Sequence, residues 1–189
     1  MAHAEVLLVM GRLQMDPAFR RAFLRDPTGA LHALDLSHAE RIALVRLDRT
    51  SVIRIGRMAD AHRIIRIQEH LSWVDLALRP SLRALLATYL ERVPPRLLNR
   101  DEALAFCEHV EVTGPDEPPY LSELVRFERL RISLAWGQSG VRSGGVSFDY
   151  PLDRVLAQLG DPGWPVVSAA PSRVELRKVP ALPAVTIRW

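Results

Sequence analysis

An apolar pattern with the period of an α-helix runs through Tyr120-Leu-Ser-Glu-Leu-Val-Arg-Phe-Glu-Arg-Leu-Arg-Ile-Ser-Leu-Ala-Trp136. Its large apolar residues recur three and four positions apart, as on the buried face of an amphipathic helix. These residues are Leu121, Leu124, Phe127, Leu130 and Leu134. We therefore predict a helix over residues 120–136 whose apolar side packs in a core.

Helix start signals precede this segment along the chain. Asp16-Pro17 and Asp26-Pro27 each place an N-cap acceptor before a proline at the first helical position. Ser37-His-Ala-Glu40 has the spacing of a capping box, and Asn99-Arg-Asp-Glu102 resembles a second one. Residues 50–78 fit one long helix or two. The remaining helices are expected over residues 81–92, before Pro94-Pro95, and from Asn99 to Val112.

The pattern changes after Gly137. Val146, Phe148 and Tyr150 alternate with polar residues, as in a half-buried strand. The elements expected in this region are a strand over 140–150, a short helix over 151–159, and a hairpin of strands over 173–179 and 185–189. We predict a mainly α protein with a helical domain over residues 1–136 and a small C-terminal α+β portion over 137–189. This tail resembles the wing end of a winged-helix unit.

Composition favours a soluble cytoplasmic protein. The 189 residues contain one cysteine, Cys107, so no internal disulfide can form. No stretch approaches the roughly 20 apolar residues that span a bilayer. The N-terminus has an acidic residue where a signal peptide is positively charged.

No motif indicates catalysis or metal binding in this chain. The sequence lacks a nucleophile elbow, a phosphate-binding loop and a dinucleotide-binding fingerprint. Cys107 and His109 form the tightest cluster of metal-ligating residue types, but residues two apart on a helix point about 200° from each other. We expect no catalytic residue, no metal site and no cofactor in this chain.

Peptide binding is the chemistry that the tail favours. An exposed sheet edge carries unpaired N–H and C=O groups, and an extended peptide can pair with them as an added strand. The alternative interpretation is that the hairpin only covers the helical core.

Three segments carry a family resemblance. They are Ala87-Thr-Tyr-Leu-Glu-Arg-Val-Pro-Pro95, Ala103-Leu-Ala-Phe-Cys-Glu-His-Val110 and Pro118-Pro-Tyr-Leu-Ser-Glu-Leu-Val-Arg-Phe-Glu128. Over residues 54–189 the chain resembles the partner proteins of multinuclear non-heme iron-dependent oxidative enzymes, a family whose members are often labelled as DNA-binding. A Tyr-Arg-Asn-Asn stretch usual in that family is absent here.

The resemblance implies a non-catalytic subunit in the biosynthesis of ribosomally made, modified peptides. Such a partner forms a heterodimer with a TIM-barrel iron enzyme, and its C-terminal sheet acts as a peptide recognition element for the leader of the precursor. The cysteine-containing core of the precursor then reaches the iron in the other subunit. No membrane or nucleic-acid partner is expected.

The residues expected to serve these roles follow from the predicted elements and the resemblance. The peptide-binding candidates are Val146, Phe148, Tyr150, Val174, Leu176, Val185 and Ile187. The candidates for the enzyme-facing surface are Pro94, Pro95, Tyr120 and Arg126.

Two other functions remain open from the sequence. The Arg-rich helices and wing-like tail are also typical of a DNA-binding transcriptional regulator. The segment Asp16-Pro-Ala-Phe-Arg-Arg-Ala-Phe-Leu-Arg-Asp-Pro27 resembles a helical module found in small subunits of ring-cleaving dioxygenases, among other proteins. It favours a structural subunit of a dioxygenase-like complex.

Overall fold

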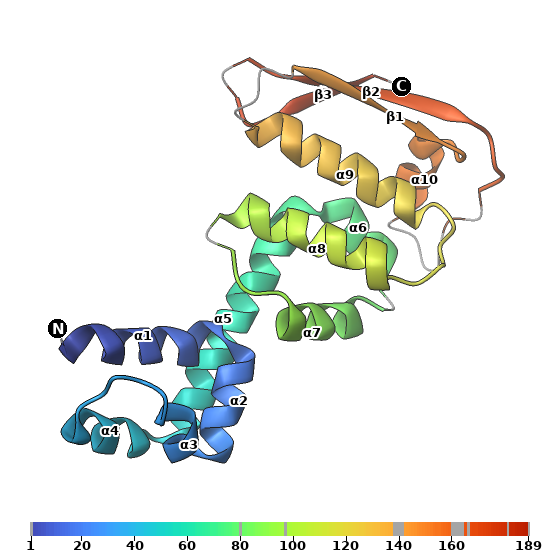
Figure 1. Cartoon of the computed structure of the whole chain (residues 1–189). Helices are drawn as coiled ribbons and strands as arrows, with labels where there is room; N and C mark the ends of the chain where they lie inside the picture. The colour runs from blue at the N-terminus through green and yellow to red at the C-terminus, as the bar shows by residue number, and fades with distance from the viewer. Residues whose placement is uncertain are drawn as a thin grey trace. The chain divides into compact units, whose positions relative to one another are not determined.

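The computed structural model describes residues 2–79, 81–96, 98–137, 142–159, 165, 167–180 and 182–188. It is mainly helical, with a small three-stranded antiparallel sheet near the C-terminus, which confirms the predicted fold class (Figure 1). Gly140 and Trp189, which the sequence places in strands, lie outside the described residues.

The chain forms two compact units. Unit 1 comprises residues 1–65 and 87–96, and unit 2 comprises residues 66–86 and 97–189. The predicted boundary between residues 136 and 137 falls inside unit 2, where a helix and the sheet share one core.

Unit 1 is built from short helices around an apolar core. They are α1 (Ala2–Met15), α2 (Pro17–Arg25), α3 (Pro27–Leu31), α4 (His38–Val45), the first part of α5 (Arg49–His70) and the last part of α7 (Leu82–Arg92). Asp16 accepts a hydrogen bond from the Phe19 amide at 2.9 Å, and Asp26 accepts one from the Gly29 amide at 3.0 Å. The capping box of Ser37 and Glu40 is also present. These three predicted helix starts are confirmed.

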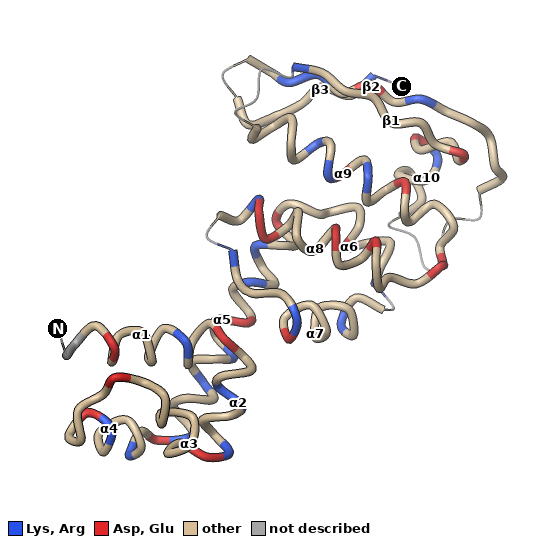
Figure 2. Tube along the Cα trace, viewed as in Figure 1, with Lys and Arg blue, Asp and Glu red and all other residues tan. Residues whose placement is uncertain are grey.

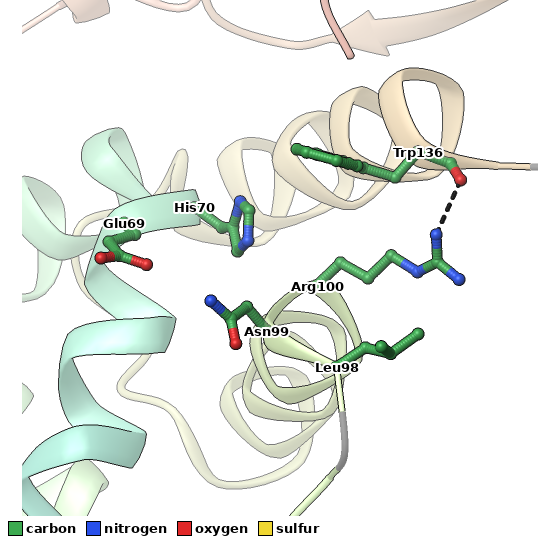
Figure 3. Close-up of a pocket in the computed structure, with 6 residues that line it drawn as sticks. All are labelled: Glu69, His70, Leu98, Asn99, Arg100 and Trp136. Carbon is green, nitrogen blue, oxygen red and sulfur yellow. Dashed lines mark hydrogen bonds between the residues drawn. The ribbon is translucent and has the colours of Figure 1, made fainter.

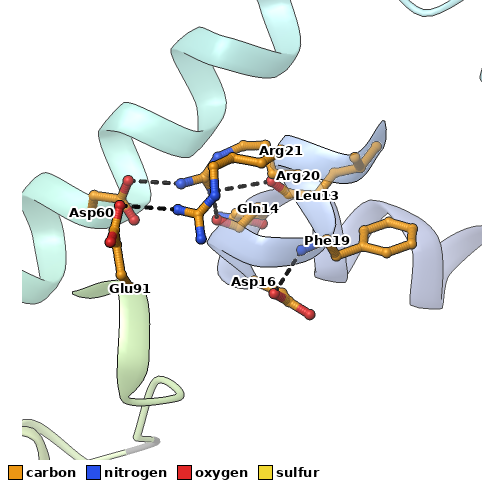
Figure 4. A network of polar contacts seen from close by, with 8 residues as sticks. All are labelled: Leu13, Gln14, Asp16, Phe19, Arg20, Arg21, Asp60 and Glu91. Carbon is orange, nitrogen blue, oxygen red and sulfur yellow. Dashed lines mark hydrogen bonds and ion pairs between the residues drawn. The ribbon is translucent and has the colours of Figure 1, made fainter. Parts of the chain in front are cut away.

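A buried arginine ties α2 to α5 within unit 1 (Figure 4). The Arg20 guanidinium donates to the Asp60 carboxylate at 2.7 Å and to the carbonyls of Leu13 and Gln14 at 3.2 and 2.9 Å. A Cβ on Gly56 would lie 2.3 Å from the Nε of Arg20. Gly56 is therefore the position at which α5 leaves room for the Arg20 side chain to cross.

Unit 2 has three layers. Its helices are α6 (Ser72–Leu78), part of α7 (Leu82–Arg92), α8 (Asn99–Thr113), α9 (Leu121–Trp136) and α10 (Leu152–Gln158), and its strands are β1 (Ser143–Phe148), β2 (Ser172–Lys178) and β3 (Val185–Arg188). Helix α9 packs against the sheet on one side and against α6 and α8 on the other (Figure 1). Apolar residues of α9 are buried toward both layers, among them Leu124, Val125 and Phe127.

One predicted helix start is wrong. Helix α8 begins at Asn99 itself, its N-cap is Leu98, and no side chain caps it. Asn99 therefore lies inside the first turn, where its side chain is not placed to accept from the amide three residues on. The helix predicted from this position is nevertheless present.

Residues 50–78 form two helices because the chain breaks at Leu71. The break frees the carbonyl of His70 and the amide of Trp73, and α9 supplies partners for both. The buried Glu128 carboxylate accepts from the Trp73 N–H at 3.2 Å and from the Arg131 Nε at 2.5 Å. The Arg131 guanidinium also donates to the His70 carbonyl. The Glu128–Arg131 ion pair of α9 thus provides hydrogen-bond partners for the backbone groups on both sides of the break.

We predict that Gly56→Ala lowers the free energy of unfolding by about 2 kcal/mol, because the new methyl group displaces Arg20 from Asp60. Alanine is otherwise the better helix residue, by roughly 1 kcal/mol. The same change in an Arg20→Ala background is therefore expected to be stabilising. Urea unfolding of the four proteins of this double-mutant cycle measures both effects, and the same sign in both backgrounds would contradict the assignment.

We predict that Glu128→Ala lowers the free energy of unfolding by about 3 kcal/mol, because it leaves a partly buried guanidinium and a helix-start amide without their acceptor. Urea unfolding of the variant against the wild type measures the loss.

Glu128→Gln provides the matched control through its pH dependence. Burial raises the pKa of the Glu128 carboxyl in the folded chain. The folded chain therefore holds this proton more tightly than the unfolded chain, and that contribution is lost as the pH rises through the raised pKa. The neutral Gln variant is expected to gain stability relative to the wild type as the pH rises from the usual glutamate pKa of about 4.3 through the raised pKa of Glu128. If the difference in free energy of unfolding between the Gln variant and the wild type does not change with pH, Glu128 does not have a raised pKa in the folded chain.

Candidate functional site

The candidate site is the three-stranded sheet of unit 2. Its strand order is β1-β2-β3 and both pairings are antiparallel, so β2 is central. Val146 lies opposite Val174, and Leu176 lies opposite Ile187. The pairing brings together six of the predicted peptide-binding residues on one face of the sheet. They are Val146, Phe148, Val174, Leu176, Val185 and Ile187.

This face packs against α9. Phe148, Val174 and Leu176 are at most 2% exposed, and the Phe148 ring lies 6.2 Å from that of Phe127 on α9. The side chains of the buried residues therefore serve the core. A ligand strand can reach only backbone groups, and only those of the two edge strands, since β2 is flanked by both.

Tyr150, the seventh predicted residue, follows the end of β1. Its ring packs edge-to-face on that of Tyr120 at 6.1 Å, and its carbonyl accepts a hydrogen bond from the Ser172 hydroxyl at 2.9 Å. The prediction that it continues the strand is wrong, because the chain turns at Asp149 and Tyr150 to enter α10.

Alternate residues of β1 direct their backbone N–H and C=O groups toward β2, and the residues between them direct theirs away from the sheet. Opposite residues in antiparallel strands alternate between hydrogen-bonded and non-bonded pairs. The Lys178 amide donates to the Arg142 carbonyl at 2.8 Å, which makes that pair a bonded one and fixes the phase. Gly144, Val146 and Phe148 then bond to β2. The N–H and C=O groups of the residues between them point away from the sheet, namely Ser143, Gly145 and Ser147.

The same reasoning applies to β3. The Val179 amide donates to the Ala184 carbonyl at 2.9 Å, so Thr186 and Arg188 bond to β2. Val185 and Ile187 then direct their backbone groups outward. Within the described residues, β1 and β3 each have β2 as their single strand neighbour. Strand β1 presents the longer edge, with three outward residues against two.

A carboxylate closes one end of the β1 edge. Asp149 follows the last residue of β1. Its N–H donates to Glu123 Oε1 at 2.7 Å, and its carbonyl accepts from the Ala170 N–H at 2.8 Å, so both backbone groups already have partners. Glu123 is buried on α9, and this burial raises the pKa of its carboxyl. A guest strand on β1 would therefore end before Asp149.

The two glycines of β1 have different neighbours. A Cβ on Gly144 would lie 2.8 Å from Leu130 of α9, so this glycine lets the helix approach the sheet. A Cβ on Gly145 would lie 3.4 Å from the Nε and Nη2 atoms of Arg173. The guanidinium of Arg173 therefore lies beside the outward-facing segment of β1, on the face of the sheet opposite α9.

That outer face is basic. The register places Arg173, Arg177 and Arg188 on this face of β2 and β3, against one acid, Glu175. Figure 2 shows that Lys and Arg recur along the strands of the sheet. The outward residues of β1 are small and exposed. The edge and the face together suit an extended strand that carries carboxylates on its outer side.

A hollow of about 500 Å³ lies at the C-terminal end of α9 (Figure 3). It is lined by Glu69, His70, Leu98, Asn99, Arg100 and Trp136. Arg100 donates to the Trp136 carbonyl at 2.9 Å, and the His70 ring packs edge-to-face on the Trp136 ring at 6.0 Å. Burial, with the neighbouring Arg131, lowers the pKa of His70. The hollow therefore has a mixed lining, in which Glu69, Asn99 and an engaged guanidinium lie beside the His70 and Trp136 rings.

This hollow adjoins the sheet. The Lys178 ammonium at the end of β2 donates to the Gly137 carbonyl at 3.0 Å, next to Trp136. Two cations, Arg100 and Lys178, thus bind the last carbonyls of α9, where the helix dipole favours positive charge. The two contacts connect α9 to α8 and to the sheet.

The predicted enzyme-facing residues differ in exposure. Pro94 is exposed and Pro95 half-buried in unit 1, and Arg126 is exposed on α9 in unit 2. Tyr120 is 2% exposed, and burial raises the pKa of its hydroxyl to about 12. Tyr120 therefore supports the start of α9 from inside the core and offers no side-chain surface to a partner.

Cys107 lies buried on α8, and burial raises the pKa of its thiol. Among the described residues, no three His, Cys, Asp or Glu side chains gather closely enough to hold a metal ion. In the same part of the chain, none of the helices has the length and apolarity that a membrane crossing needs.

Comparison of the chain with protein-family models, curated proteins and solved structures found no match. The class that the structure defines is a mainly helical protein with a small antiparallel sheet.

Proposed function

We propose that this chain is a non-catalytic partner subunit that binds the leader of a ribosomal precursor peptide as an added strand. In this proposal it presents the cysteine-containing core of that peptide to a TIM-barrel multinuclear iron oxidase. The iron and the redox chemistry belong to the enzyme, and the partner contributes position and effective concentration.

The outer side of β1, along which the described part of the chain places no other strand, is the observation that carries the proposal. Three residues in phase, Ser143, Gly145 and Ser147, direct six backbone groups away from the sheet. Main-chain hydrogen bonds of this kind supply affinity when a peptide is added to a sheet as a strand. They depend little on the side chains of the added peptide. The motif resemblance of residues 54–189 supports the same role from the sequence side.

The surroundings of the edge favour an acidic guest strand. A residue of the guest opposite Gly145 on the outer face lies within reach of the Arg173 guanidinium, which favours a carboxylate there. The small side chains of β1 leave room for larger ones on the guest. The closed end at Asp149 limits the pairing to the Ser143–Ser147 segment.

We predict that Gly145→Pro lowers affinity for the leader about tenfold, because the proline removes one outward amide and its ring obstructs the guest strand. The bonds to β2 stay intact, since Gly145 does not bond to β2. The probe is the fluorescently labelled N-terminal half of the short cysteine-containing peptide expected in a neighbouring reading frame. Fluorescence anisotropy gives the dissociation constant.

Val185→Pro is the matched control, because it removes an outward amide from the other edge of the sheet and is expected to leave affinity within about twofold. Equal losses for the two variants would contradict pairing at β1. Binding of duplex DNA in the same assay, falling steeply with salt, would favour the alternative of a DNA-binding regulator. Absence of any affinity for the leader would favour a purely structural subunit.

A further inference from the structure

Helix α1 is apolar on the side that unit 1 leaves uncovered. Val9 and Leu13 are buried in the unit 1 core, as expected of an amphipathic helix. Yet Leu7 is 70% exposed and Leu8 50%, and Met10 is also exposed. A helix with apolar residues on all sides is normally buried on all sides. The outer face of α1 therefore has the composition of a contact surface.

Leu8 belongs to a stripe of α1 residues with the spacing of a helix–helix contact, and Leu7 and Met10 lie beside this stripe. At about 100° per residue, positions 4, 8, 11 and 15 lie on one side of the helix. They are Ala4, Leu8, Gly11 and Met15, and none is charged. A Cβ on Gly11 would meet nothing within 4 Å. Glycine in the middle of a helix costs stability, so an open one on an apolar face indicates close approach by another backbone.

A groove continues this surface toward α4. It is lined by Val6, Leu7, Met10, Glu40, Ala43, Leu44 and Leu47. Its one acid, Glu40, is already engaged in the capping box with Ser37. The stripe and the groove thus provide projecting leucines and an apolar recess side by side, which is what a self-complementary surface requires.

The charged residues beside the stripe favour a second copy of this chain, packed antiparallel, as the partner of α1. Glu5 lies near one end of the stripe and Arg12 near the other, on the same side of α1. When two copies of α1 pack antiparallel, each Glu5 comes within one helical turn of the Arg12 of the other copy. The Arg12 guanidinium lies 4.0 Å from the centroid of the Phe19 ring and 3.5 Å from the Asp16 carboxylate, and its side chain is still 41% exposed, so a second carboxylate can reach its remaining N–H groups. A parallel arrangement would place like charges together.

We propose that the outer face of α1 is a homodimer interface, in which two copies of this chain pack their α1 helices antiparallel across Leu8 and Gly11. The two-fold contact buries the exposed leucines of both copies and pairs Glu5 with Arg12 at each end.

Sedimentation velocity of the full chain over about 1–200 µM tests the proposal. The wild type is expected to reach twice the 21.3 kDa of one chain. Leu8→Glu is expected to stay at the single-chain mass throughout, because it places two carboxylates in the centre of the contact. Val112→Glu, at an exposed position of α8, is the matched control and is expected to dimerise like the wild type.

A second variant tests whether loss of the dimer in Leu8→Glu reflects misfolding of α1. Gly11→Leu keeps α1 helical but fills the space that the partner helix needs, so it is also expected to be monomeric, with an unchanged circular dichroism spectrum. A monomeric wild type at the highest concentration would overturn the proposal and leave this face to a different partner. A dimer that persists in Leu8→Glu would overturn it as well.

Discussion

The ion pair between Glu128 and Arg131 is the contact on which the arrangement of unit 2 depends. It satisfies the carbonyl that ends α5 and the amide that starts α6, and so it holds the break at Leu71 against α9. Burying a carboxylate is costly unless its partners are close. Glu128 has two, one charged and one at a helix start, which fixes the position of α9 along α6.

Helix α9, whose position the ion pair fixes, also packs against the sheet. Its opposite side packs on the apolar face of β1, β2 and β3, and Gly144 lets Leu130 approach the first strand closely. Arg100 and Lys178 then hold its last turn to α8 and to β2. With one face covered and the central strand paired on both sides, the sheet has its edges and its basic outer face without a strand or helix partner among the described residues.

Local sequence signals predicted much of this fold. Asp16, Asp26 and Ser37 act through neighbours three residues away, so their helices could be predicted from the sequence alone. The alternation in β2 and β3 likewise predicted the hairpin. The capping box at Asn99 failed because its spacing does not reveal on which residue the helix begins.

The candidate site was less accessible to sequence reasoning. Apolar alternation identifies the face of a strand that is buried, and so it selected Phe148 and Leu176, whose side chains belong to the core. The outward groups of Ser143, Gly145 and Ser147 depend on the register of β1 against a strand almost thirty residues away. Glycine and serine carry no apolar signal, although this alternation with small polar residues is itself a hint of an edge. The burial of Tyr120 and the roles of Glu123 and Glu128 also required three-dimensional contacts.

Amide hydrogen exchange along β1, measured by NMR on the purified chain without peptide, tests the central claim most directly. A free outer edge predicts alternating protection, with slow exchange at Gly144, Val146 and Phe148 and fast exchange at Ser143, Gly145 and Ser147. Slow exchange at all six amides would contradict the account, because it would mean that another segment of the chain already covers the edge.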